Sequence, residues 1–389
     1  MKILFIEPCN YSDYPLGGHL SFALHLTQAM EGTIDLVGIT TNANDKIGKW
    51  TKKEVHGYDY NILNVAYIKK SSFKKPIIPT RIKNFFYLKK HLNKISLDLY
   101  DLIIVQTPEV LLALPKKYLP RVCLIMPGVE NPLSISRYKF ARKFQHIYDK
   151  FFFRCAAHTR YVLAAADKES ITTFINRSKG KINPQKVFQF PTRYDADIFN
   201  IKDKDALRRK YSIPINEIVI TITGRLNWFK GWQFIVDSFI LFKQEYPSSH
   251  LYFIGDGEDR KKIETYIQEK NCTDSISLLG RQGLDFVSDY LGLSDLYVMG
   301  SYKEGWSTAL VEAVASAVPC VVTDFSSAQD MIIDGINGFV VKERNENLFA
   351  KKMADALQLK RNDILSRAKW SEQYSVQNMR NQLNKIINN

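Results

Sequence analysis

Residues 218–242 read IVITITGRLNWFKGWQFIVDSFILF. The first six are all β-branched, which is typical of a buried strand. After residue 231 the apolar side chains recur at helical spacing, at Phe234, Ile235, Phe239 and Phe242. GRLNWFKG, residues 224–231, therefore predicts a loop that joins a strand to a helix, the repeating unit of parallel sheets covered by helices.

The same alternation of short apolar runs and helical segments extends along the rest of the chain. We expect earlier strands at 3–6, 33–39, 102–105, 122–125, 161–164 and 187–189, and later strands at 251–254, 276–279, 296–299 and 320–323. Around Pro191 neither periodicity is present, so the interdomain linker is expected near 191–205. The sequence predicts an α/β protein of two doubly wound parallel-sheet domains facing each other across a ligand-binding cleft.

Positive charge is concentrated in the first half of the 389 residues. Lys and Arg number 54 against 40 Asp and Glu, a net charge of +14. Residues 1–200 contain 30 basic and 16 acidic residues, whereas residues 201–389 contain 24 of each. The excess favours an anionic partner for the first half, either nucleic acid or an acidic membrane surface.

Cysteine usage and the length of apolar runs predict the compartment. The five cysteines are scattered and form no CxxC pair, which argues against a disulfide framework and a zinc site. The opening MKILFIEP is too short for a signal peptide, and no run approaches the roughly 18 apolar residues of a membrane span. We therefore expect a cytoplasmic protein that is neither exported nor membrane-spanning.

The loop 224–231 carries two cations, Arg225 and Lys230. Both lie beside the expected N-terminus of a helix, where the helix dipole is positive and anions bind. Two fixed cations at that place suit a diphosphate group. The alternative is a solvated loop with two surface charges.

A second motif, EGWSTALVEA, spans residues 304–313. Ser307 is an expected N-cap, which would leave the backbone N–H groups of Thr308, Ala309 and Leu310 free for a ligand. Glu304 precedes the cap and Glu312 lies more than one turn inside the helix. The two carboxylates would therefore accept hydrogen bonds from hydroxyl groups at two separate positions along one ligand. A merely dipole-stabilising role would explain Glu304 but not Glu312.

Together with LYFIGDGEDRKKIE (251–264), LLGRQ (278–282), LSDLYVMGSYKEGWSTALVEAVASAVPCVVTD (293–324) and DGINGFVV (334–341), these motifs closely resemble glycosyltransferase family 4. The resemblance covers roughly residues 220–341, in the family's order and spacing, with the two glutamates as its E-x7-E motif. It implies the GT-B fold. It also implies an acceptor-binding domain over 1–196, a donor-binding domain over 205–370, and a C-terminal helix near 371–389 packed back on the first domain.

The resemblance also implies roles for individual residues. Arg225 and Lys230 would neutralise the donor diphosphate, Glu304 would contact the donor sugar and Glu312 would bind the ribose. The other implied donor contacts are Gly17 and Gly18, where the backbone can approach the phosphates, and Arg281 and Gln282 near the base. The catalytic group would be Arg225, Lys230 and Glu304.

The implied activity is a metal-independent, retaining transfer of a sugar from a nucleoside-diphosphate sugar to a glycan or lipid-linked acceptor, in bacterial surface-polysaccharide assembly. A UDP-sugar is favoured and a GDP-sugar is possible. No cofactor, metal ion or nucleic acid is expected to bind. Retention is implied by the resemblance alone.

Three places depart from the family pattern or suggest a rival site. After the strand at 122–125 the family's histidine is absent, which leaves Glu130, Asn131 and His19 as candidates for sugar or acceptor contacts, each with an ordinary structural alternative. Asp195-Ala196-Asp197 has the DxD pattern of metal sites but falls in the expected linker. GDGEDR, residues 255–260, predicts a turn and a helix start rather than a dinucleotide site.

Two segments, 74–95 and 137–154, combine basic residues with apolar or aromatic ones. In the first, Lys83, Lys89, Lys90 and Lys94 interleave with Ile82, Phe85, Leu88, Leu92 and Ile95. In the second, basic residues accompany Tyr138, Phe144, Tyr148 and 151–153. They suit docking at an anionic lipid surface, the inner face of the plasma membrane. The alternative is two crossover helices with solvated charged faces.

Two other functions remain open at this stage. A GT-B-fold sugar-nucleotide epimerase would release its product to water and would need carboxylates in the first domain. A non-enzymatic nucleic-acid-binding protein would explain the charge, but the sequence shows no motif typical of that class and the neutral second half would have no role.

Overall fold

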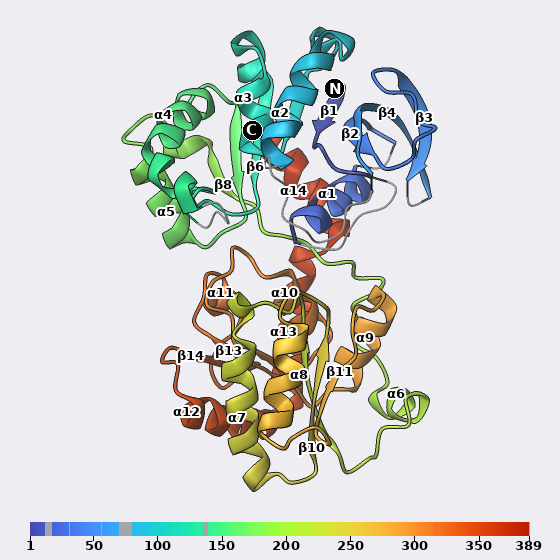
Figure 1. Ribbon diagram of the computed structural model, residues 1–389, viewed down its shortest axis with the longest axis vertical. Helices are drawn as coiled ribbons and strands as arrows, with labels where there is room; N and C mark the ends of the chain where they lie inside the picture. Colours follow the sequence, from blue (N-terminus) through green and yellow to red (C-terminus); the bar gives the residue numbers. More distant parts are fainter. Residues whose placement is uncertain (12–17, 31, 56, 70–79, 135–138, 389) are drawn as a thin grey trace. The chain divides into compact units, whose positions relative to one another are not determined.

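The computed structural model describes residues 1–11, 18–30, 32–55, 57–69, 80–134 and 139–388. The chain divides into two units, Met1–Thr192 and Arg193–Asn389. Each is an α/β structure built on its own sheet (Figure 1). In the described part of the chain, no helix is long and apolar enough to cross a bilayer.

The sheet of the first unit has eight strands among the described residues, in the order β3-β4-β2-β1-β5-β6-β7-β8. The strands are β1 Ile3–Ile6, β2 Ile34–Thr40, β3 Trp50–Val55, β4 Tyr58–Tyr67, β5 Leu102–Val105, β6 Val122–Met126, β7 Tyr161–Ala164 and β8 Val187–Gln189. All neighbours are parallel except β3 and β4, which form an antiparallel hairpin. The six expected strands are present, and the hairpin was not expected.

Helices accompany this sheet: α1 Gly18–Ala29, α2 Thr80–His91, α3 Pro108–Ala113, α4 Gln145–Ala156 and α5 Lys168–Arg177. α3 packs against both α2 and α4 (Figure 1). Phe152 and Phe153 of α4 are buried against Phe174 of α5, with ring centroids 6.4 and 5.4 Å from it. Their expected place on a lipid-facing surface is therefore wrong, because they belong to the core.

The basic segments differ from expectation in two more ways. Residues 74–79 and 137–138, including Tyr138, lie outside the described residues. Ile82, expected on the apolar side of its helix, is exposed, whereas Leu88 is buried in the core of the unit. The buried side of α2 is set by its packing on α3 and β4, so sequence spacing alone misplaced Ile82.

The second unit has a six-stranded sheet, parallel throughout its described pairs, in the order β11-β10-β9-β12-β13-β14. The strands are β9 Ile218–Thr223, β10 Ser249–Ile254, β11 Ile276–Leu278, β12 Leu296–Met299, β13 Cys320–Thr323 and β14 Gly338–Val341. The chain extends the sheet from β9 to one side and returns to its other side with β12. This reversal of strand order, at the carboxyl ends of β9 and β12, is where such sheets bind ligands.

Its helices are α6 Lys204–Lys210, α7 Trp232–Glu245, α8 Arg260–Glu269, α9 Leu284–Leu293, α10 Thr308–Ala315, α11 Ala328–Met331, α12 Glu346–Leu357, α13 Arg361–Trp370 and α14 Val376–Asn388. α7 begins directly after the quoted loop and buries Phe234, Phe239 and Phe242. Phe234 meets Phe349 of α12 edge to face, with ring centroids 5.1 Å apart. The strand–loop–helix unit predicted at 218–242 is confirmed.

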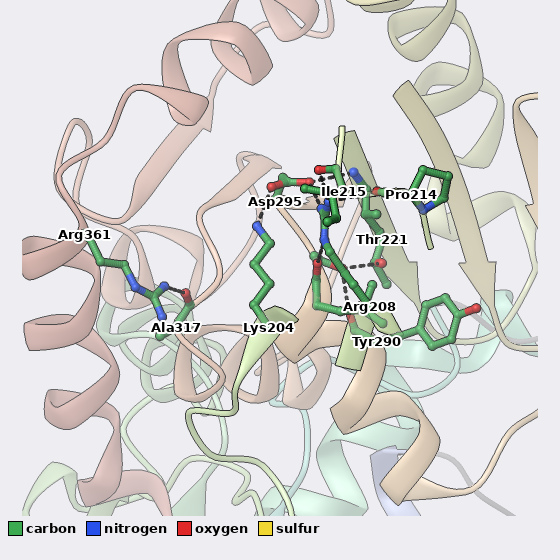
Figure 2. A network of polar contacts seen from close by, with 12 residues as sticks. Lys204, Arg208, Pro214, Ile215, Thr221, Tyr290, Asp295, Ala317 and Arg361 are labelled. Carbon is green, nitrogen blue, oxygen red and sulfur yellow. Dashed lines mark hydrogen bonds and ion pairs between the residues drawn. The ribbon is translucent and has the colours of Figure 1, made fainter. Parts of the chain in front are cut away.

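A buried ion pair fixes α6 to this sheet (Figure 2). Arg208 Nη2 donates to Asp295 Oδ2 at 2.6 Å, and the backbone N–H of Val219 donates to the same oxygen at 2.7 Å. Lys204 pairs with the other carboxylate oxygen, and Arg208 Nη1 also donates to the Ile215 carbonyl at 2.9 Å. The segment from 204 to 215 is therefore held to β9 and to the start of β12.

Candidate active site

The loops that follow β9 and β12 meet at the reversal of strand order. The N–H of Tyr302 donates to the Phe229 carbonyl at 2.8 Å and so joins the two loops. Gly231 has a φ of +63°, and a Cβ there would lie 1.9 Å from the Gly300 carbonyl oxygen. Only glycine permits this approach, so GRLNWFKG ends in Gly because its loop packs directly on the loop after β12.

Lys230 and Glu304 form a partly buried ion pair between these loops. Lys230 Nζ lies 2.6 Å from Glu304 Oε1, with side chains 25% and 16% exposed. The Ser301 hydroxyl donates to the same oxygen, also at 2.6 Å. Within the described part of the chain neither contact uses Oε2, so that oxygen remains available to a ligand hydroxyl. The structure thus brings together two of the predicted residues that lie 74 positions apart in the sequence.

Arg225 lies at the rim of the same loop. Its side chain is 48% exposed and its Nε donates to Glu258 Oε2 at 2.9 Å. Glu258 belongs to GDGEDR, whose turn packs on the Arg225 loop: a Cβ on Gly255, where φ is +151°, would lie 1.8 Å from the Gly224 carbonyl oxygen. α8 then starts at Arg260. The prediction of a turn and helix start for this motif is confirmed.

Ser307 caps α10 as predicted. Its hydroxyl accepts from the Leu310 N–H at 3.3 Å. This bond corrects one expectation: the Leu310 N–H is used by the cap and is not free for a ligand. Ala309 N–H has no hydrogen-bond partner among the described residues, and Thr308 lies beside it at the start of the helix.

Glu312 lies on α10, one turn further along. Its side chain is half-buried; its backbone carbonyl accepts from Ser316, whereas its carboxylate makes no hydrogen bond or ion pair with any described residue. Burial raises the pKa of its carboxyl to about 8. A partly desolvated carboxyl without a partner gains from a ligand that supplies one, so Glu312 is a candidate hydroxyl acceptor.

Arg344, which sequence reasoning missed, supports the loop that carries Glu304. Its Nη2 donates to the Gly300 carbonyl at 2.9 Å, and its guanidinium lies 3.7 Å from the centre of the Tyr302 ring. Burial lowers the pKa of Arg344. Ser301 was missed as well. Neither residue belongs to a recognisable sequence motif. Arg344 binds backbone carbonyls and Ser301 contributes a single hydroxyl, and such contacts leave no signature in the sequence.

The two residues expected near the base lie after β11. Arg281 is exposed. Gln282 Nε2 donates to the Leu279 carbonyl at 2.6 Å, so its amide group closes its own turn. The Gly280 carbonyl accepts from the Gly255 N–H at 2.8 Å, which ties this turn to GDGEDR.

The remaining candidates belong to the first unit. Gly17 lies outside the described residues, Gly18 is the first residue of α1, and His19 follows it.

Glu130 is exposed, and Asn131 is buried in the loop after β6. Asn131 Nδ2 donates to Asp149 Oδ1 at 2.9 Å and to the Gln145 carbonyl at 3.0 Å, while its Oδ1 accepts from the Leu133 N–H at 2.9 Å. With both ends of its amide used inside the chain, Asn131 has the structural role that was its alternative.

The DxD pattern is part of a turn. Asp195 Oδ1 accepts from the Asp197 N–H at 3.0 Å, and Asp197 Oδ2 accepts from Gln377 Nε2 at 3.2 Å. Across the described ranges, no three His, Cys, Asp or Glu side chains converge to form a possible metal site. Independence of metal ions remains a prediction.

A family model matches much of the second unit, and known proteins match part of the chain in sequence. Residues 203–375 match the family model described as Glycosyl transferases group 1. The putative glycosyltransferase EpsD of Bacillus subtilis is 25% identical over 154 residues, 39% of this chain and 39% of that protein. The UDP-Gal:alpha-D-GlcNAc-diphosphoundecaprenol alpha-1,3-galactosyltransferase of Escherichia coli is 24% identical over 191 residues, 48% and 49% of the two chains. The matches thus span less than half the length of these relatives.

Solved structures resemble the whole chain. Sucrose-phosphate synthase from Thermosynechococcus elongatus has a TM-score of 0.76 at 15% identity, covering 99% of this chain and 98% of that one. HepE of Anabaena, solved in complex with UDP, has a TM-score of 0.73 at 16% identity, covering 100% of each. These likenesses confirm the predicted GT-B fold. Residues 203–375, which hold the Lys230–Glu304 pair and the α10 cap, are thus similar to the glycosyl transferases group 1, and the relatives named above are glycosyltransferases.

Proposed function

We propose that this protein transfers a sugar from a nucleoside-diphosphate sugar, with retention of configuration and without a metal ion, to a glycan or lipid-linked acceptor in bacterial surface-polysaccharide assembly. The observation that carries the proposal is the Lys230–Glu304 pair at the reversal of strand order, 2.6 Å across and beside the cap of α10. It offers a cation for the diphosphate and a carboxylate for the sugar at one place.

The geometry suits charge that develops on the leaving diphosphate. As the bond from the anomeric carbon to the phosphate oxygen breaks, its electron pair stays on the diphosphate, where Lys230, Arg225 and the N-terminus of α10 stabilise it. The acceptor oxygen bonds to the same face of the sugar, and its proton passes to the leaving phosphate oxygen. Glu304 Oε2 accepts from a sugar hydroxyl, and Glu312 accepts from the ribose.

The choice of a UDP-sugar rests on similar proteins. The Escherichia coli relative is named for a UDP-galactose donor and a lipid-diphosphate acceptor, and Anabaena HepE was solved with UDP and with UDP-glucose. Membership of family 4, and with it retention, rests on the motif order between residues 220 and 341.

The test is turnover with a panel of UDP- and GDP-sugars and glycan acceptors, with and without excess EDTA. We expect release of the nucleoside diphosphate, a product whose anomeric configuration in NMR equals that of the donor, and the same rate in EDTA. A product of inverted anomeric configuration would exclude retention, and strict Mn²⁺ or Mg²⁺ dependence would exclude the metal-free mechanism.

The same assays distinguish the two alternative functions. Release of an altered free sugar would favour the epimerase. Salt-sensitive DNA binding without any turnover would favour the nucleic-acid-binding protein.

We further propose a cytoplasmic location at the inner face of the membrane. Phe86 of α2, Phe140 and Phe144 of the 3₁₀ segment Lys139–Phe144, and Phe151 of α4 are 51–65% exposed. Exposed lysines and arginines accompany them on the same segments. Aromatic side chains beside cations suit an anionic lipid surface.

A further inference from the structure

Two large aromatic side chains are exposed beside the candidate active site. Trp228 is 59% exposed and Tyr302 is 53% exposed. Each lies two residues before a member of the ion pair, Lys230 or Glu304. Exposed aromatic rings lose favourable burial energy, so a pair of them on the two loops of a ligand site needs an explanation.

Both rings are fixed on one face from within the chain. The Trp228 ring stacks on Phe229, with centroids 3.8 Å apart and 27° between planes. The Tyr302 ring lies against the Arg344 guanidinium at 3.7 Å, and that guanidinium is itself held by the Gly300 carbonyl. The rings are therefore ordered before any ligand binds, which reduces the entropy lost on binding.

The arrangement of the two rings limits what could cover them. Their centroids are 5.9 Å apart and their planes are tilted by 53°. Two rings form a surface far smaller than the roughly 800 Å² that each partner contributes to a stable protein interface. Lys303, which is exposed, lies between Tyr302 and Glu304, so the surroundings are polar. A pyranose ring, with apolar C–H faces and hydroxyl edges, matches both the rings and their surroundings.

We propose that Trp228 and Tyr302 form a stacking platform for a sugar ring of the acceptor glycan. This inference rests on the proposed function, in which Lys230 and Glu304 hold the diphosphate and the donor sugar. Because Lys230 and Glu304 are already assigned to the donor, a further sugar ring on the two aromatic side chains belongs to the acceptor. Arg344 acts as a positioning residue that holds the platform through Tyr302.

A fluorescence measurement tests occupancy without turnover. All five tryptophans lie in the described part of the chain, and Trp228 is the one among them that is mostly exposed, so acrylamide quenches it preferentially. With UDP present, we expect at least one of the methyl glycosides of glucose, galactose and N-acetylglucosamine to protect Trp228, and Trp228→Phe to abolish that signal. Protection by UDP alone or by phospholipid vesicles would overturn the proposal, as would the absence of protection by every glycoside.

Kinetics with the accepted glycan provide the second test. We expect Trp228→Ala and Tyr302→Ala each to raise the KM for the acceptor roughly 3- to 10-fold, the range of one aromatic stacking contact. The KM for the donor should stay within about twofold, a change of about 0.4 kcal/mol, because the proposal assigns neither ring to the donor. Trp228→Phe and Tyr302→Phe keep a ring and should restore most acceptor affinity, and Ile215→Ala, at an exposed site elsewhere in the second unit, is the control.

The two tests separate this proposal from the function on which it rests. An unchanged acceptor KM in both alanine variants, with turnover intact, would overturn the platform and leave glycosyl transfer standing. Protection of Trp228 by glycosides in a protein that turns over no nucleotide sugar would support a sugar platform and overturn the proposed transfer.

Discussion

Lys230 is the residue on which the proposed donor site depends most. Its ammonium group is partly buried and paired with Glu304 at 2.6 Å, so it would be held in place before a diphosphate binds. Preorganised charge of this kind stabilises a developing anion without reorganisation. We expect Lys230→Ala and Arg225→Ala each to lower kcat/KM by about 10²- to 10³-fold while the protein stays folded.

The control for these variants is Lys261→Ala, an exposed lysine on α8. Circular dichroism and thermal unfolding would verify that all three proteins fold. If Lys230→Ala or Arg225→Ala kept more than half of the wild-type rate, the assignment of that residue to the diphosphate would be wrong.

Glu312 makes the stability of the ligand-free protein depend on pH. Burial raises the pKa of its carboxyl to about 8, above the roughly 4.3 of a free Glu, so the folded state holds the proton more tightly than the unfolded chain. The contribution is fully present below about pH 4 and is lost as the pH rises through about 8. Nearby Tyr297 does not titrate in this range, because burial raises its pKa too.

Glu312→Gln should therefore be at least as stable as wild type at about pH 9 and lose less stability between about pH 5 and pH 9. Thermal denaturation at both values checks this, with Glu269→Gln, an exposed carboxylate on α8, as the control. The same pH dependence in wild type and Glu312→Gln would contradict the raised pKa of this carboxyl.

At the scale of elements, α6 is held by charge rather than by a large apolar face. The Arg208 side chain is 5% exposed and its ion pair with Asp295 joins α6 to β9 and β12. Removing one partner of a buried pair leaves the other uncompensated. We expect Arg208→Ala to lower the free energy of unfolding by about 3 kcal/mol in urea titrations, whereas Lys210→Ala, with an exposed ammonium, should cost less than about 1 kcal/mol. Equal losses in the two variants would argue against the buried pair as the anchor.

Most strands of both sheets could be predicted from sequence, the central ones most plainly. β1, β5 and β12 are short, apolar and buried at every position, as expected for parallel strands covered on both faces. β3 was missed because WTKKEV alternates polar side chains in a partly exposed antiparallel hairpin. β14 lies at the edge of its sheet. It was missed because Gly335 and Asn337, just before it, are typical of a turn. Local apolar content thus revealed strands at both the centre and the edge of the sheets, β8 and β11 included, and missed the hairpin β3–β4 and the edge strand β14.

The same limit applies to the candidate site. Arg225, Lys230, Glu304 and Ser307 were predictable because each stands at a loop or cap whose type the adjacent strand and helix define. Arg344 acts 44 residues away from Gly300, on a backbone carbonyl that any residue provides. No spacing rule encodes such a contact. Supporting residues of this kind therefore need the fold before they can be found.

For the whole molecule, the charge asymmetry has a structural counterpart in the first unit. The exposed phenylalanines of α2, of segment 139–144 and of α4 accompany lysines and arginines on the same elements. Phe152 and Phe153, by contrast, serve the core. These elements therefore carry both charges, whose attraction to a membrane is screened by salt, and exposed apolar rings, whose burial is not screened. Two sets of substitutions can separate these contributions.

Replacing Lys83, Lys89, Lys90 and Lys94 with Glu should weaken binding to anionic vesicles by orders of magnitude, because each basic residue near such a surface contributes about 1 kcal/mol. The control replaces four exposed lysines of the second unit with Glu: Lys261, Lys351, Lys360 and Lys369. It changes the net charge by the same amount and should leave binding close to wild type.

The double variant Phe86→Ser with Phe144→Ser should weaken the binding that persists at high salt, where the Debye length falls to about 3 Å. Vesicle sedimentation measures all of these. Equal binding to neutral and anionic vesicles, or equal loss in the two four-Glu variants, would leave α2 and α4 as solvated helix surfaces.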